Sequence, residues 1–417
     1  MKGWIISDND MVNSNHHPAN NEFDLDQDAV DRRFMQAAIR YARRHNGITG
    51  TNPSVACLIV ARHFSSTDHS VKYWIAGRGV TAIGGRPHAE PIAIEEAGRH
   101  AEGATAYVTL EPCAHHGVTA PCATTLINAG IKRVVSAQRD PDSRVDSKGF
   151  QMLLDAGVEV VEGVETRLAA WDLRGYLARK TRSKPWVTLK LAVTSDGYLG
   201  VGDGRQVAIT GAVTNVQTHL LRSRADAILV GSGTIINDDP SLNCRLPGLQ
   251  DRSPIRVVVE NNKPIAATGN FIDAAARIET YIACPQQNLK ARKADLQHTA
   301  CKFIACDLKE GQVALPELLA DLSELGVAFL MVEGGAKIAG AMLQNKLVDE
   351  ILLYSGGQSL VNLLDEGETG SNKAWIKSPV LADAIPEVFH LSGQWRFGND
   401  SVRRYTLNPA TDLIDAP

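Results

Sequence analysis

The sequence is poor in several features, and each shortage excludes a class of protein. Its 417 residues contain no apolar run long enough to cross a bilayer, because the longest runs, such as 55–61 and 327–332, have the length of a strand. Aromatic residues make up 6% of the chain and the net charge is only −4, so we expect no basic surface with stacking aromatics for nucleic acid. Seven irregularly spaced cysteines argue against a disulfide scaffold and for a reducing compartment.

The composition that remains indicates a folded protein with more than one domain. Hydrophobic residues make up 44% of the chain, which rules out a disordered or collagenous protein. A chain of this length corresponds to about two to four domains. Residues 1–24 carry one lysine and a very short apolar stretch, unlike a secretory signal peptide. We expect residues 1–26 to be a mobile extension without chemistry, and the protein to be cytoplasmic with no membrane partner.

Hydrophobic periodicity predicts strands that alternate with helices in both halves of the chain, without a convincing internal repeat. The first half is predicted to form helices over 27–44, 88–100, 121–129 and 148–156, and strands over 55–61, 73–80, 104–110, 133–138 and 158–163. The first two of these strands should form a hairpin with a long loop. The second half is predicted to form strands over 186–193, 227–231, 255–260, 280–284, 328–333 and 350–354, and helices over 212–224, 315–325 and 335–345.

A basic stretch, RGYLARKTRSK at 174–184, stands directly before Pro185. Charge runs of this kind are usually solvated, so we interpret the stretch as a linker or a solvated helix face. It is the best candidate for a boundary, and we therefore predict one domain over 27–178 and a second over 185–417.

The strongest chemical signal in the first half is His88, followed by Cys113 and, nine residues later, Cys122. One imidazole and two thiolates provide three ligands for a tetrahedral ion of intermediate softness, which indicates Zn²⁺. Three protein ligands leave a fourth position for water, as in a catalytic zinc site. Glu90 lies at the start of a predicted helix, two residues after His88, where it could take a proton from that water and pass it to a leaving nitrogen.

Each part of this pattern is weak when taken alone. A His-x-Glu triplet in a helix is usually structural, and two cysteines nine positions apart are more often unligated thiols. Their co-occurrence is the His-x-Glu…Pro-Cys arrangement of zinc nucleobase deaminases, in which the glutamate is the acid and base and not a ligand. A purely structural zinc module is less favoured, because no fourth protein ligand is evident nearby.

The segments TNPSVACLIV (51–60), GGRPHAE (84–90), AYVTLEPCAHHG (106–117) and APCATTLINAGIKRVV (120–135) also resemble one particular family. They are similar to the deaminase half of the bifunctional riboflavin-biosynthesis deaminase/reductases. This resemblance covers about residues 30 to 360. It implies a cytidine-deaminase-like three-layer α/β domain and a small-molecule substrate, a diaminopyrimidinone that carries a phosphoribosylamino group. In that family, water displaces the 2-amino group and ammonia leaves.

The resemblance assigns roles to single residues of the first half. It implies that His88, Cys113 and Cys122 bind zinc and that Glu90 is catalytic. It also places Asn52 and His115 at the substrate. The residues alone leave other interpretations open, since an asparagine before a proline is commonly a turn former and a histidine in this position can be an ordinary loop residue.

One position departs from the family pattern. Family members commonly carry Arg or Lys after the glycine of the His-His-Gly motif, where it can meet the substrate phosphate, whereas this chain has Val118. An apolar side chain cannot supply that charge-assisted hydrogen bond. Either another cation binds the phosphate, or binding is weakened.

The second half contains glycine-rich strand ends. The segments 230–234 (VGSGT) and 333–335 (EGG) place small residues where a backbone can approach a phosphate or a nicotinamide. A helix that starts at Gly335 would offer free N–H groups to a pyrophosphate. No complete G-x-G-x-x-G motif is present, so dinucleotide binding and simple tight turns both remain open.

These segments also resemble the reductase half of the same family, whose fold is similar to dihydrofolate reductase. The resemblance implies that NADPH delivers hydride to C1 of the opened ribosyl group. It places the following residues at the cofactor: Ala192, Thr234, Asp238, Gly335, Ala336, Lys337, Ile338, Ala339, Gly340 and Ala341. It places these residues at the substrate: Gln206, Arg222, Leu242, Arg245 and Glu333. From the residues alone, Arg222 on a helix face could be solvated, and the segment from Asp238 to Pro240 could be a turn.

A second departure lies at 204–210 (GRQVAIT), where many family members have Ser-x-Trp before Ile-Thr. Gln206 and Ala208 occupy those two positions. The hypothesis is a bifunctional riboflavin-pathway enzyme that deaminates and then reduces, with a homo-oligomer expected from family precedent. The alternatives are a related deaminase/reductase that acts on another modified pyrimidine, and a nucleic-acid-editing deaminase.

Overall fold

The computed structural model describes residues 5–6, 26–64, 71–115, 120–142, 144–201, 207–364, 375–380 and 385–407. Val118, Gln206 and most of the predicted extension 1–26 lie outside these ranges. The chain divides into two compact units, of which the first runs to Thr181 and the second begins at Arg182. Within the described ranges, no helix combines the length and the hydropathy that a membrane crossing requires.

The first unit contains a six-stranded mixed sheet with the order β1-β3-β2-β4-β5-β6. The predicted hairpin is confirmed, because β2 and β3 pair antiparallel, while β4, β5 and β6 run parallel. The strands are β1 (Ile5–Ile6), β2 (Ala56–Phe64), β3 (Val71–Val80), β4 (Thr105–Val108), β5 (Arg133–Ser136) and β6 (Glu159–Glu162).

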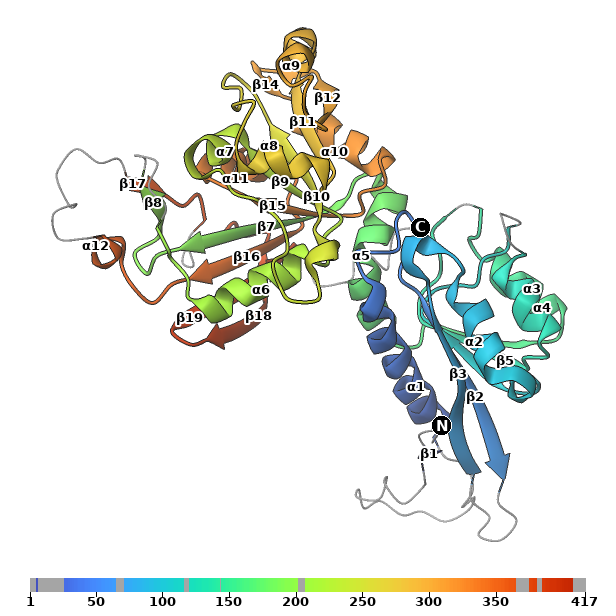
Figure 1. Ribbon diagram of the computed structural model, residues 1–417. Coiled ribbons are helices and arrows are strands. Elements are labelled where there is room, and N and C mark those ends of the chain that lie inside the picture. Colours follow the sequence, from blue (N-terminus) through green and yellow to red (C-terminus); the bar gives the residue numbers. More distant parts are fainter. Residues whose placement is uncertain are drawn as a thin grey trace. The chain divides into compact units, whose positions relative to one another are not determined.

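Helices cover both faces of this sheet because alternate strand residues point to opposite sides. Ala56, Leu58 and Val60 of β2 pack with α1 (Gln27–Ala42). Cys57 and Ile59 pack with α2 (Ala89–Ala97), α3 (Cys122–Asn128) and α4 (Lys148–Asp155) on the other face. Figure 1 shows these layers. The last helix of the unit, α5 (Thr166–Arg182), contributes to both cores.

Two glycines of β3 allow α2 to lie unusually close to the sheet. A Cβ atom added at Gly77 would come within 2.1 Å of the Ala93 carbonyl oxygen, and one at Gly79 within 1.9 Å of the Ala89 carbonyl oxygen. Any larger residue would push the helix away. Because Glu90 lies in the first turn of α2, this contact also fixes the position of a predicted catalytic side chain.

The basic stretch 174–184 is not a solvated linker, and that interpretation is wrong for its first half. It forms the end of α5, where Gly175, Tyr176, Leu177 and Ala178 are buried. The charged residues therefore flank a block of four buried residues on a single amphipathic helix.

A buried ion pair connects α1 to β5. Asp31 is 2% exposed and accepts hydrogen bonds from both Nη atoms of Arg133, at 2.8 and 2.7 Å, and from the Tyr107 hydroxyl at 2.8 Å. Burial alone would raise the pKa of the Asp31 carboxyl, but hydrogen bonds from Arg133 and Tyr107 hold it below its ordinary value. The carboxylate is therefore ionised and depends on these partners.

We expect the substitution Arg133→Met to destabilise the first unit by about 3–5 kcal/mol, because it leaves a buried carboxylate without its cation. Denaturant unfolding of the full chain measures this loss. Arg78→Met is the matched control, since the ion pair of Arg78 with Glu96 is exposed and should contribute no more than about 1 kcal/mol. Equal losses of unfolding free energy in the two variants would contradict the conclusion that the Asp31 carboxylate depends on Arg133.

The second unit contains a nine-stranded sheet with the order β12-β11-β10-β9-β15-β7-β16-β19-β18, parallel from β12 to β16 and antiparallel at β19 and β18. Its strands are β7 (Trp186–Val193), β9 (Ala227–Gly231), β10 (Ile255–Val259), β11 (Thr280–Pro285), β12 (Lys302–Cys306), β15 (Phe329–Glu333), β16 (Glu350–Ser355), β18 (His390–Phe397) and β19 (Asp400–Thr406). Two further sheets pair β8 (Tyr198–Val201) with β17 (Trp375–Lys377), and β13 (Leu308–Lys309) with β14 (Gln312–Val313).

Helices cover this sheet on both faces as well. One core packs α10 (Leu315–Glu324) and α11 (Ala336–Gln344) against β7, β15 and β16. The other core lies under α7 (Ser232–Asp238) and α8 (Asn270–Asp273) and includes Ile228 and Val230 of β9. The remaining helices are α6 (Ala212–Arg222), α9 (Leu289–Asp295) and α12 (Leu360–Leu363). The strand ends of β9 and β15 therefore meet the starts of α7 and α11.

Candidate active sites

The three predicted zinc ligands stand at the ends of elements in the first unit. His88 is the N-cap residue of α2, and Cys122 is the first residue of α3. Cys113 lies in the loop after β4, and its sulfur accepts a hydrogen bond from the Cys122 backbone N–H at 3.3 Å. Two helix starts and one loop therefore bring the three side chains together.

The geometry of the three ligands fits a zinc ion. The His88 Nδ1 atom lies 3.3 Å from the Cys122 Sγ atom and 3.7 Å from the Cys113 Sγ atom, and all ligand atoms lie within 4.8 Å of one another. Tetrahedral zinc with bonds of about 2.3 Å to sulfur and about 2.0–2.1 Å to nitrogen requires an N···S separation of about 3.6 Å. Hydrogen bonds from Cys122 and His88 also lower the pKa of the Cys113 thiol to about 4, which favours the thiolate.

Glu90 lies beside this cluster on the first turn of α2. Its side chain is buried, with the residue only 3% exposed, and it forms a hydrogen bond with the Cys122 side chain. Burial raises the pKa of the Glu90 carboxyl above its ordinary value. A buried carboxyl group beside the three ligands is placed to accept a proton and to return it.

Glu111 is a positioning residue whose role the sequence did not reveal, although it stands in the Glu-Pro-Cys segment. Its carboxylate accepts backbone N–H groups from Asp140 at 3.3 Å, Ser147 at 3.2 Å and Gly149 at 3.0 Å. Because Glu111 is two residues before Cys113, these bonds fix the ligand loop to the loop that follows β5.

His88, Glu90 and Cys113 line a cavity of about 220 Å³. Asn52 and His115, the predicted substrate contacts, also line it. The Asn52 side chain donates a hydrogen bond to the Gly85 carbonyl at 2.9 Å, so it stabilises the adjacent turn as well. The His115 Nδ1 atom is buried and has no hydrogen-bond partner among the described residues. An incoming polar ligand could satisfy it.

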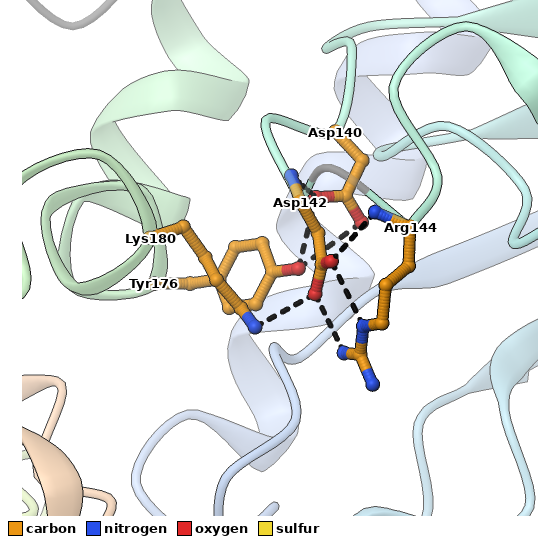
Figure 2. Close-up of polar contacts among 5 residues, drawn as sticks. All are labelled: Asp140, Asp142, Arg144, Tyr176 and Lys180. Atoms are coloured by element: carbon orange, nitrogen blue, oxygen red, sulfur yellow. Dashed lines mark hydrogen bonds and ion pairs between the residues drawn. The ribbon is translucent and has the colours of Figure 1, made fainter.

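The cavity has a second polar wall that the sequence did not predict (Figure 2). Asp142 and Asp140, from the loop after β5, are 7% and 5% exposed. The Asp142 carboxylate accepts hydrogen bonds from Lys180 Nζ at 2.7 Å and from Arg144 Nη2 at 2.6 Å. The Tyr176 hydroxyl donates to Asp140 at 2.9 Å. The end of α5 thus forms part of the cavity.

In the second unit, Arg222 and Glu333 form one buried pair. Arg222 donates from Nε to Glu333 Oε1 at 2.7 Å and from Nη2 to Oε2 at 2.9 Å, and their side chains are 11% and 12% exposed. Arg222 also donates to the Asn243 carbonyl at 3.2 Å. The interpretation of Arg222 as a solvated helix residue is therefore wrong. Its charge is directed at Glu333, at the end of β15.

Lys190 is a candidate site residue that the sequence analysis missed. It stands opposite Glu333 in the register of β7 and β15, and its ammonium lies 5.1 Å from the centre of the Tyr354 ring. Burial lowers the pKa of Lys190. In the sequence, Lys190 is a single lysine within the apolar strand WVTLKLAV. Such a lysine does not by itself indicate a functional site.

The other predicted residues of the second unit lie around the same strand ends. Ala192 is in β7, Thr234 and Asp238 are on α7, and residues 335–341 run from the N-cap of α11 into its second turn. Leu242 is 2% exposed, so its side chain belongs to the core and only its backbone could meet a substrate. Arg245 is exposed and donates to the Asn243 side chain at 3.1 Å.

Comparisons with known proteins find relatives for both halves of the chain. The cytidine and deoxycytidylate deaminase zinc-binding region matches residues 28–138, and the RibD C-terminal domain matches residues 185–357. The riboflavin biosynthesis protein RibD of Haemophilus influenzae is 34% identical over 339 residues, which cover 79% of this chain and 85% of that protein. The chain belongs to the RibD family. The RibD of Escherichia coli is also 34% identical, over 78% of this chain and 87% of its own length.

Solved RibD structures have the same architecture. Acinetobacter baumannii RibD superposes with a TM-score of 0.75 at 30% identity, over 91% of this chain and 99% of its own. The predicted fold class, a cytidine-deaminase-like domain followed by a dihydrofolate-reductase-like domain, is confirmed. As a member of the RibD family, the chain is a bifunctional deaminase and reductase of riboflavin biosynthesis, with zinc and NADPH as its cofactors.

Proposed function

We propose that the first unit hydrolyses the 2-amino group of 2,5-diamino-6-(5-phosphoribosylamino)pyrimidin-4(3H)-one. The RibD-like protein of Thermotoga maritima, similar to this chain with a TM-score of 0.72 at 25% identity, is described as a diaminohydroxyphosphoribosylaminopyrimidine deaminase and 5-amino-6-(5-phosphoribosylamino)uracil reductase. The observation that carries the proposal is the convergence of His88, Cys113 and Cys122 next to the buried Glu90, at the wall of a cavity.

In this proposal His88, Cys113 and Cys122 hold the zinc ion, which supplies the Lewis acidity that makes water a nucleophile at neutral pH. Glu90 takes the proton from the attacking water and delivers it to the departing amino group, which leaves as ammonia. Asn52 and His115 orient the pyrimidine. The buried position of Glu90 supports this role, because its proton cannot be lost readily to bulk solvent.

For the second unit we propose reduction of the ribosyl group of the deaminated product to a ribityl group. Ala192, Thr234, Asp238 and the start of α11 would bind NADPH, which supplies the hydride. Gln206, the backbone at Leu242, Arg245 and Glu333 would contact the substrate. Arg222 would orient Glu333 through their buried pair, which leaves the exposed Arg245 as the cation better placed to meet a phosphate.

We further propose that the protein works in the cytoplasm as a homo-oligomer and that nucleic acid is not a partner. The net charge of −4 supports the last point, because a nucleic-acid-editing deaminase would need a basic surface. A gel-shift titration at moderate salt would check the statement about nucleic acid, and a sedimentation measurement would check the oligomeric state.

Incubation with the diaminopyrimidinone phosphate tests the main proposal. Mass spectrometry should show a change of about +1 Da without NADPH and a further change of about +2 Da with it, since one NH is exchanged for O and two hydrogens are then added. NADPH oxidation should begin only once the deaminated pyrimidine is present. Oxidation of NADPH before any deaminated pyrimidine has formed would contradict the order of the two steps. Turnover of another modified pyrimidine, and none of the diaminopyrimidinone phosphate, would show that the substrate is a different compound.

A further inference from the structure

The ligand loop of the deaminase cavity contains no lysine or arginine. Residues 113–122 read CAHHGVTAPC, so the loop between the two cysteine ligands offers no permanently positive side chain. The proposed substrate carries a phosphate of charge about −1.5 to −2 at neutral pH. A cation for this phosphate must come from another part of the cavity wall.

The end of α5 and the loop after β5 supply such a cation (Figure 2). Lys180 lines the cavity with its side chain 23% exposed, and its Nζ atom donates to Asp142 Oδ2 at 2.7 Å. An ammonium group has three N–H donors. One is used by Asp142, and the Nζ atom also lies 5.7 Å from the centre of the Tyr176 ring. The ammonium group therefore has donor capacity beyond its bond to Asp142.

Two cations share the negative charge of Asp142. Hydrogen bonds from Arg144 and Lys180 hold the pKa of Asp142 well below its usual range, so this carboxylate is ionised. It is paired with both Lys180 and Arg144, so this single carboxylate neutralises only one of the two cations. The Asp140 carboxyl group lies in the same wall. The Arg144 side chain is 62% exposed and also lines the cavity.

The remaining groups that face this wall hold it in place. Burial raises the pKa of Asp140, whose carboxyl group accepts hydrogen bonds from the Tyr176 hydroxyl at 2.9 Å and from the Asp142 backbone N–H at 2.9 Å. Asp140 in turn donates its own backbone N–H to Glu111 at 3.3 Å. The loop that carries Asp142 is therefore bonded both to α5 and to the loop of the zinc ligands.

We propose that Lys180, oriented by the buried Asp142 carboxylate, binds the substrate phosphate in the deaminase cavity. This inference rests on the proposed function, because it concerns how that substrate is held. Arg86 and Arg179 also line the cavity and interact with other groups of the chain. For Lys180, the buried Asp142 carboxylate fixes the ammonium group at the cavity wall. Lys180 is a binding residue and Asp142 a positioning residue.

Comparing the substrate with and without its phosphate separates a binding role of Lys180 from a purely structural one. A structural role would affect deamination of both compounds equally. The substitution Lys180→Met in the full chain should lower kcat/KM for the phosphorylated diaminopyrimidinone by on the order of 10- to 100-fold, mainly through KM, since a hydrogen bond between charged groups is lost. Deamination of the same compound after phosphatase treatment should change less than about twofold. Lys180→Arg should retain most of the preference for the phosphorylated compound.

Arg139→Met is the matched control. Arg139 precedes Asp140 directly, but its ion pair with Glu162 is exposed and it does not line the cavity. This variant should keep the wild-type ratio of the two kcat/KM values. Inorganic phosphate gives a second measurement, because it should inhibit deamination of the dephosphorylated compound more strongly in wild type than in Lys180→Met.

An equal loss of activity on both compounds would overturn the inference, as would an unchanged ratio between them. Failure of the proposed function would look different, because the wild-type chain itself would then deaminate neither compound although it contains zinc. That result would overturn both proposals.

Discussion

Replacing Cys113 with alanine should remove zinc from the protein and abolish deamination, while reduction of the deaminated pyrimidine continues. Two ligands bind zinc too weakly to retain it, and without the ion water keeps its ordinary pKa of 15.7 instead of about 7. We expect the rate of deamination to fall by roughly four orders of magnitude or more. The reductase should be unaffected, because its residues lie in the other compact unit of the chain.

Elemental analysis of the protein prepared without chelators measures the loss of zinc. It should give about one zinc per wild-type chain and about none for the Cys113→Ala variant. Cys301→Ala is the matched control, since Cys301 is a half-buried free cysteine of the second unit and no member of the metal cluster. Wild-type zinc content in the Cys113 variant would show that the sulfur is not a ligand. Loss of both activities together would indicate misfolding, which the reductase assay detects.

The zinc site could be predicted from the sequence because it is built from local structure. His88 and Cys122 stand at helix starts, and Glu90 follows His88 by two residues, so the spacing in the sequence nearly determines the spacing in space. The strands that position these helices were also predicted within a few residues. Their hydrophobic residues alternate or form short apolar runs, which gives a clear pattern.

The rest of the site depends on pairs of residues that are distant in the sequence. Asp142 and Lys180 are 38 positions apart, and Arg222 and Glu333 are 111 apart. Such contacts follow from the order of strands in a sheet, which periodicity does not reveal. The basic run at 174–184 was therefore interpreted as solvated, although its helix forms a wall of the cavity.

The C-terminal strands were not predicted for a similar reason. β18 and β19 add an antiparallel edge to a sheet that is otherwise parallel, and β19 pairs with β16 across more than 45 residues of sequence. In β18, residues such as Leu391 and Trp395 are exposed, so the strand lacks the apolar face that marks a strand in a sequence. Its partner in the sheet, and not its own hydrophobicity, determines its structure.

The substitution Glu90→Gln should nearly abolish deamination while the zinc ion stays in place. An amide has almost the same shape as a carboxyl group but cannot take up and release a proton at neutral pH, so we expect kcat to fall by roughly 10²- to 10⁴-fold. Because Glu90 is buried and burial already favours its neutral form, the neutral glutamine should be tolerated in the fold. The variant should therefore keep its unfolding midpoint and its reductase activity.

Glu95→Gln removes a similar charge from the same helix, α2, at an exposed position, and should leave deamination unchanged. Comparison of the two variants separates proton transfer from a general effect of charge. If Glu90→Gln also lost zinc, Glu90 would have to be counted as a ligand and not as the group that moves the proton. If it kept full activity, another group in the cavity would have to move the proton. A substitution of His115 would then be the next test, because its Nδ1 atom is buried and has no hydrogen-bond partner among the described residues.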